Sequence, residues 1–224
     1  SGGGIGHGRT TPEDATAGSS GTGGGGGGGS HPGTSNPGAN GGSGVIVLRY
    51  KIAELTATAK ASGGAISFYG GKTIHAFTNS GNFVTPGSFD ETVEYVVVGG
   101  GGAGGGPSTP GNSYYGGGGG AGTIKKNSIP ISTPQTIAVT IGGGGAKGQF
   151  VPAAGSASLF GPTIPAPGGG YGATWIDPGG GPTTGGGPGG SSGGANYGGS
   201  VQPSTGDNFS PTNAAANTPN SGWG

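Results

Sequence analysis

Long runs of glycine restrict what this chain can fold into more than any other feature of its sequence. Glycine supplies 65 of the 224 residues, and the stretches 23–29, 116–120 and 142–145 contain nothing else. Glycine loses more backbone freedom on ordering than any other residue, and it brings no side chain to a core. The runs therefore indicate either flexible linkers or segments that pack backbone against backbone.

Collagen is the first alternative to exclude, because the glycine runs interrupt its strict Gly-X-Y period and proline is sparse. A flexible linker remains open, but linkers do not usually enclose regular strands such as 136–141. Packed polyproline II segments fit better, since helices without side chains can lie close and bond through backbone N–H groups and weaker Cα–H contacts. Alanines that interrupt the runs are consistent with close approach, namely Ala103, Ala121, Ala146 and Ala173.

Hydrophobic core material is scarce. Leu, Ile, Val and Phe together make up about 14% of the chain, which is below the level of ordinary globular domains. Cysteine is absent, so no disulfide framework compensates. We therefore expect no single continuous hydrophobic core, and we expect self-association as a homotrimer or a fibrous stack.

The charge balance narrows the possible partners. Eight basic and eight acidic residues cancel, and only 7% of the chain is charged, so we expect no nucleic acid partner. No apolar run reaches the length of a membrane span, and we expect no membrane insertion. Methionine is absent even at position 1, so we expect a segment or processed product of a longer polypeptide.

Alternating apolar residues predict a strand over 45–52, in which Ile46, Leu48, Tyr50 and Ile52 share one face. A hairpin is predicted over 65–78, because Gly70 and Gly71 can adopt the positive φ of a primed turn. Its register places Phe68 opposite Thr73 and Ile66 opposite His75, with Phe77 on the same face. Further strands are predicted at 82–84, 92–98, 123–126, 136–141 and 156–160.

The predicted fold class is all-β, with a short-stranded block resembling a β-sandwich combined with glycine-rich layers of the polyproline II type. The segment 52–61 is the best helical candidate, but its threonines also suit a strand or linker. We therefore expect no substantial helix.

No motif in the sequence supports catalysis. Gly99, Gly101 and Gly104 after a strand match a dinucleotide fingerprint, but further glycines and Pro107 follow where a helix must begin. Asp90, Glu91 and Glu94 resemble paired carboxylates but lack an apolar pocket, and we interpret them as solvated residues at the end of a strand.

His75 alternates with apolar residues and is interpreted as structural. Asp177 and Asp207 are isolated, whereas calcium-binding glycine repeats need recurrent aspartates. We predict no catalytic residue, no cofactor and no metal site, and hence no enzyme.

The sequence resembles the glycine-rich repeat domains of tail-fibre and structural proteins of bacteriophages, notably marine ones. The resemblance rests on 73–78, on Gly81-Asn-Phe83 and on 93–98 leading into glycines. The middle and closing parts of such a repeat are similar to three further segments of the chain, 137–141, 158–161 and 42–50. Fibre-tip adhesins with glycine-rich cores are a more distant likeness.

In such proteins a strand like 42–50 closes a domain, whereas here it precedes the opening motif. The resemblance therefore implies that 1–50 is the end of a preceding repeat, with its last strand at 45–52. Residues 51–64 would be a connection. The next repeat would open with the strands of 65–98 and continue through the glycine-rich region 99–224.

The resemblance implies a structural or adhesive virion fibre, located outside the cell, that provides spacing or host attachment. A cellular extracellular filament or surface-array protein with the same repeat is the alternative. An ice-binding polyproline II bundle is the third possibility.

Some aromatic residues stand among glycines and polar residues instead of in alternating strands. They are candidate receptor contacts for a host glycan or an outer-membrane protein, since Tyr and Trp offer rigid contact area at small entropic cost. They could equally cover glycine backbone or fill gaps between chains. The residues concerned are Tyr114, Tyr115, Tyr171, Trp175 and Tyr197.

Overall fold

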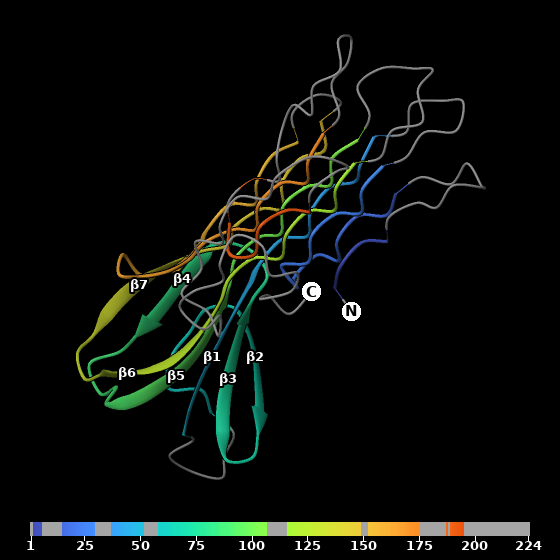
Figure 1. Cartoon of the computed structure of the whole chain (residues 1–224). Coiled ribbons are helices and arrows are strands. Elements are labelled where there is room, and N and C mark those ends of the chain that lie inside the picture. The colour runs from blue at the N-terminus through green and yellow to red at the C-terminus, as the bar shows by residue number, and fades with distance from the viewer. Residues whose placement is uncertain are drawn as a thin grey trace, which may run out of the picture.

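The computed structural model describes residues 2–5, 15–29, 37–51, 58–106, 116–148, 152–174, 187 and 189–194. These residues form two continuous parts, a β-sandwich and a bundle of extended glycine segments that leads away from it (Figure 1). The described residues contain strands and extended segments but no helix. The all-β prediction is confirmed. The candidate helix 52–61 has only its last four residues in the described part, and these are not helical.

Two antiparallel sheets make up the sandwich. The larger sheet has the order β2-β3-β1-β5-β6, and the smaller has the order β4-β7-β8-β9. The strands of the larger sheet are β1 Val45–Lys51, β2 Ala65–Tyr69, β3 Lys72–Phe77, β5 Glu91–Val98 and β6 Ile124–Ile131. Those of the smaller sheet are β4 Gly81–Thr85, β7 Gln135–Thr140, β8 Ser158–Phe160 and β9 Ile164–Ala166.

The predicted hairpin is confirmed in both turn and register. Gly70 and Gly71 connect β2 to β3 with φ of 58° and 72°, the positive values that a two-residue primed turn needs. Phe68 pairs with Thr73 and Ile66 pairs with His75. The hairpin therefore follows directly from its local sequence.

The prediction against a hydrophobic core needs correction, because the sandwich has a compact one. Buried side chains from both sheets form a single cluster. Its ring contacts include Phe83 against Phe89 and Phe160, with centroids 6.1 Å apart in each pair. The apolar residues suffice because they serve only the sandwich, while the glycine-rich part needs none.

Two strands were missed in whole or in part by the prediction, and both contain proline. β6 continues to Ile131 through Pro130, well beyond the predicted end at 126, and β9 contains Pro165 and was not predicted. Each is the last strand of its sheet, where proline is tolerated at positions whose N–H group would face solvent instead of a neighbouring strand. β8 is shorter than predicted, because 156 and 157 belong to an extended glycine segment.

The extended segments lie side by side and exchange backbone hydrogen bonds. They are 2–5, 15–18, 23–29, 37–44, 99–106, 116–123, 142–148, 152–157, 167–174 and 189–194.

The central segment is 99–106, and its bonds repeat every third residue, the period of polyproline II. Segment 116–123 accepts backbone hydrogen bonds from the N–H groups of Gly99, Gly102 and Gly105. Gly100 and Ala103 donate to 152–157, and Gly101 and Gly104 donate to 37–44.

The central segment also accepts hydrogen bonds, from 23–29, 142–148 and 167–174. It is therefore bonded to six neighbours, which alternate between chains that run parallel and antiparallel to it. Each neighbour in the ring is also joined to the next by a backbone hydrogen bond. The pairs, with the N–H donor first, are Gly119 and Gly26, Ala39 and Gly27, Gly41 and Gly145, Ala153 and Ala146, Gly155 and Gly169, and Gly120 and Gly170. The expected polyproline II packing thus takes the form of a hexagonal bundle.

Glycine is required at many positions of this bundle because the backbones there approach too closely for a side chain. A Cβ atom built on Gly102 would lie 2.0 Å from the carbonyl oxygen of Gly170, and one built on Gly101 would lie 2.1 Å from that of Gly24. Of the interrupting alanines, Ala103 and Ala173 are fully buried, whereas Ala146 is exposed. Alanine therefore marks both interior gaps and the surface of the bundle.

The two parts of the chain that the sequence assigns to successive repeats are joined closely. β1 lies between β3 and β5 in the larger sheet. Segments 23–29 and 37–44 complete the ring around 99–106. The division at 50, 64 and 98 into repeats stays a prediction about the origin of the chain.

Matched glycine substitutions test the bundle. Gly102→Ala should lower the free energy of unfolding by about 2–4 kcal/mol, because the methyl group forces two backbones apart. Gly143→Ala should change it by less than about 1 kcal/mol, since no atom lies within 4 Å of its added Cβ. Guanidinium unfolding followed by circular dichroism measures both. Equal losses in the two variants would contradict the close-packed bundle.

Candidate interaction surface

Of the five aromatic residues proposed as receptor contacts, only Tyr171 lies within the described residues. Tyr114, Tyr115, Trp175 and Tyr197 lie outside them. Tyr171 is half-buried in segment 167–174. Its carbonyl oxygen accepts the N–H of Gly187 at 2.7 Å. A Cβ atom added to Gly187 would lie 2.3 Å from the Tyr171 ring.

Tyr171 therefore packs its ring against a glycine backbone, as the packing alternative describes. Its role in receptor contact stays a prediction.

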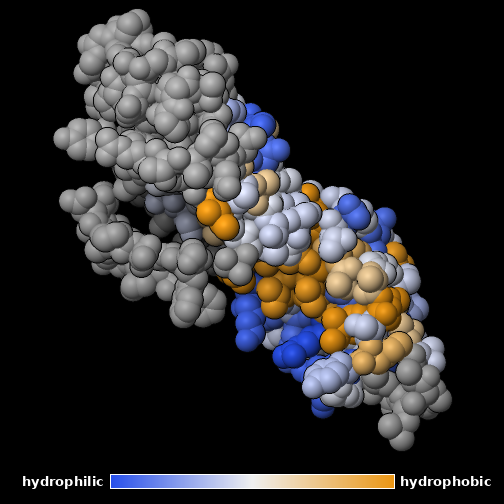
Figure 2. Space-filling model, turned by 90° about the vertical axis from the view of Figure 1, so that its right-hand side faces the viewer, coloured by the Kyte–Doolittle hydropathy of each residue, from blue (hydrophilic) through white to orange (hydrophobic). Residues whose placement is uncertain are grey.

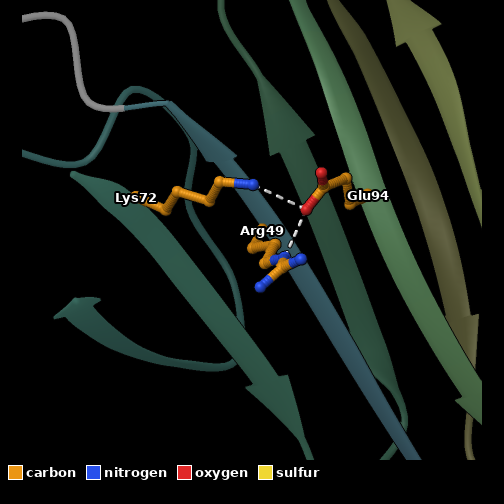
Figure 3. A network of polar contacts seen from close by, with 3 residues as sticks. All are labelled: Arg49, Lys72 and Glu94. Carbon is orange, nitrogen blue, oxygen red and sulfur yellow. Dashed lines mark hydrogen bonds and ion pairs between the residues drawn. The ribbon is translucent and has the colours of Figure 1, made fainter. Parts of the chain in front are cut away.

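The outer face of the larger sheet presents a group of charged side chains. Arg49 on β1 lies directly opposite Glu94 on β5, and the two form an ion pair. Lys72 on β3 reaches across β1 and donates to the same Glu94 oxygen at 2.8 Å (Figure 3). The hydrogen bond from Lys72, with Arg49 beside it, lowers the pKa of the Glu94 carboxyl.

This arrangement places more positive than negative charge on the face. Lys72 lies directly opposite Lys51 in the register, and like charges in that position repel. Glu94 offsets part of the repulsion. Glu94 was expected to be a solvated residue, and it does remain 41% exposed while pairing with two cations.

Apolar side chains adjoin the charged group on the same face. Val47 lies opposite both Ala76 and Val96 in neighbouring strands, and all three are half-buried. The space-filling view shows a hydrophobic stretch bordered by hydrophilic residues on the described part of the molecule (Figure 2). Protein contact surfaces combine an apolar centre with a polar rim, and this face carries both kinds of side chain side by side.

Comparison with known proteins identifies one relationship. A family model described as a glycine-rich domain matches residues 77–224, about two thirds of the chain. The chain belongs to this glycine-rich domain family. No curated protein and no solved structure matches the chain.

The matched residues 77–224 contain the central segment 99–106, β4 to β9 and most of the bundle. The residues before it supply β1 to β3 and two of the six segments around the centre.

The described residues of the chain contain neither a metal centre nor a membrane-spanning helix. No group of three His, Asp or Glu side chains there could hold a metal ion. No helix in the same residues is long and apolar enough to cross a membrane. The remaining polar group of interest is buried in the sandwich.

That buried group consists of Tyr50 and His75, both almost fully shielded from solvent. His75 Nδ1 lies 2.6 Å from the Gly63 carbonyl oxygen, which can only accept, so this nitrogen carries the proton. In the neutral ring Nε2 then accepts from the Tyr50 hydroxyl at 3.0 Å. The Tyr50 oxygen in turn accepts the N–H of Ala61 at 3.1 Å.

Each polar atom of the pair is thus satisfied within the core, and the geometry fits the structural role inferred for His75. Burial lowers the pKa of His75 and raises the pKa of Tyr50, because the interior disfavours the charged form of either ring. The pair anchors the chain at Ala61 and Gly63 to the sandwich.

We predict that the burial of His75 makes the stability of the protein depend on pH. The pKa of His75 is lowered in the folded state, so the unfolded chain binds the proton first as pH falls below about 6.5. The free energy of unfolding should therefore decrease below that pH by up to about 1.4 kcal/mol per pH unit. Urea unfolding between pH 7.5 and 5.5 measures the slope.

His75→Asn should reduce this slope, because Asn keeps a donor for Gly63 but does not titrate. His7→Asn, which removes a histidine outside the described residues, serves as the control. Equal slopes in the wild type and the His75 variant would contradict the assignment.

Proposed function

We propose that this protein is a structural and adhesive fibre protein and not an enzyme. The fibre is most simply a bacteriophage tail fibre or another virion fibre, acting outside the cell in spacing or host attachment. The observation that carries the proposal is the central segment 99–106, which is bonded to six neighbours through its backbone.

Such a bundle is suited to a rigid spacer. Every residue from Gly99 to Gly105 donates a hydrogen bond of 2.8–3.0 Å to a neighbouring segment. At about 3.1 Å per residue, eight residues span about 25 Å without any side-chain core. A chain built this way becomes longer without needing more apolar residues. Length of this kind is more useful to a fibre than to an enzyme.

The bundle also has two different ends, one joined to the strands of the sandwich and one away from it, where the sequence is free to vary. Six of its segments continue directly into strands of the sandwich, as segment 37–44 does into β1 and segment 99–106 does from β5. Their opposite ends lie together away from the sandwich (Figure 1). The bundle thus fixes both ends of each sequence that connects two of its segments on that side. A connection with fixed ends can vary in sequence, which favours contact with different surfaces.

Self-association as a homotrimer or a fibrous stack belongs to this proposal, since a fibre needs repeated copies. A host glycan or an outer-membrane protein is the proposed receptor. A cellular extracellular filament would use the same architecture, and binding to cells of its own source instead of a bacterial host would favour that function.

Cell binding tests the adhesive role. Fluorescently labelled protein should bind some strains of a panel of bacteria, and Tyr114→Ala with Tyr115→Ala should reduce that binding at least about fivefold with little change in melting temperature. Tyr and Trp contacts of this kind contribute much of the affinity of a binding surface.

The control is Ile124→Ala, which removes an exposed hydrophobic residue of the sandwich and should bind as the wild type does. Undiminished binding by the double variant would remove these tyrosines from the receptor contact. Absence of binding to every strain would contradict adhesion and leave spacing as the function.

A further inference from the structure

β2 is an unusual edge strand. It is the first strand in the order of the larger sheet, and no described residue pairs with its outer side. All five of its residues are exposed. Ile66 and Phe68 are 42% and 39% exposed, and Tyr69 is 82% exposed. An apolar strand is thus left open along one whole side.

The other three sheet edges are protected in ways that natural proteins use against unwanted pairing. β6, the opposite edge of the same sheet, carries Lys126 and Pro130. β9 has three residues, one of them Pro165. β4 is partly covered, because Ser62 forms a bridge to Val84.

β2 has none of these devices. Its sequence, Ala-Ile-Ser-Phe-Tyr, contains no charge and no proline. Its pairing with β3 is regular from end to end, without a bulge. The single unprotected edge of the described molecule therefore indicates a strand that is kept available for pairing.

We propose that β2 pairs antiparallel with β2 of a second copy of this chain, across a two-fold axis at Ser67. The contact joins the two larger sheets into one continuous sheet. This inference deepens the proposed fibre function and rests on it, because it names the contact through which copies associate. It makes a dimer the unit of a fibrous stack and excludes a trimer at this contact.

Hydrogen-bonding geometry supports a second copy as the occupant. In a two-residue hairpin the residues beside the turn bond to each other, so Tyr69, Ser67 and Ala65 bond to β3. The N–H and C=O groups of Ile66 and Phe68 then point away from β3. Pairing about Ser67 brings Ile66 opposite Phe68 of the second copy, so the free groups of both strands meet.

Side chains are also self-complementary in this register. Ile66 and Phe68 face the same side as His75, and pairing places them beside Phe68 and Ile66 of the second copy. Aromatic and β-branched side chains opposite each other stabilise antiparallel pairs. No like charges meet, because β2 carries none.

A cysteine at the axis tests the proposal directly. The chain has no cysteine, so Ser67→Cys introduces the only thiol. Ser67 and its symmetry mate form a non-hydrogen-bonded pair with Cα atoms about 4.5 Å apart, within disulfide range. Oxidation at about 20 μM should convert most of the protein to a disulfide-linked dimer on a non-reducing gel.

The matched control is Ser128→Cys, an exposed serine on the outer face of β6, which should remain mostly monomeric. Equal cross-linking of the two variants, or none in either, would overturn the proposal.

A charge on the edge provides the second test. The wild type should sediment as a dimer and Phe68→Lys as a monomer at the same concentration. In a dimer of the variant, the lysine of each copy would be buried opposite Ile66 of the other copy. The melting temperature of the variant should stay within a few degrees of the wild type. An unchanged sedimentation coefficient, or a wild-type trimer, would overturn the proposal.

Cell binding distinguishes this inference from the proposed function. If Ser67→Cys fails to cross-link while labelled protein still binds bacteria, the adhesive fibre stands and β2 is not its contact. If cross-linking succeeds and no strain is bound, the β2 contact stands and adhesion fails.

Discussion

Close approach between glycine backbones is the interaction on which the rest of this structure depends. In the central segment each N–H from Gly99 to Gly105 reaches a carbonyl oxygen of another segment at 2.8–3.0 Å. A side chain at Gly100, Gly102 or Gly105 would place its Cβ within about 2 Å of a neighbouring carbonyl oxygen. Glycine is usually costly to order, and here that cost is offset because its lack of a side chain lets each backbone bond in several directions.

The sandwich and the bundle share one connectivity. β1, β5 and β6 are neighbours in the larger sheet, and the segments that join them, 37–44, 99–106 and 116–123, are bonded in the same order. The smaller sheet behaves in the same way, since the segments beside β7, β8 and β9 are bonded in sequence. Strand pairing therefore determines which glycine segments meet.

Local features of the fold could be read from the sequence, and features set by distant neighbours could not. Gly70 and Gly71 fix the β2 to β3 turn by themselves, so the hairpin register was predicted correctly. β9 was missed because Pro165 argues against a strand unless its edge position is known. The exposure of Phe68 could not be predicted from the sequence either, because it depends on how far the smaller sheet extends over the larger one. Only Tyr171 of the five predicted contact residues can be placed in the structure.

A glycine bundle alone would not have a unique register. Its segments repeat every three residues, so a slip of three restores nearly the same hydrogen bonds. The sandwich removes this ambiguity, because a strand that slips by one residue turns its buried side chains to solvent. A slip of three has the same effect, since three is odd, and β1 would lose Ile46, Leu48 and Tyr50 from the core. A small hydrophobic core at one end therefore fixes the register of a bundle that has almost no side chains of its own.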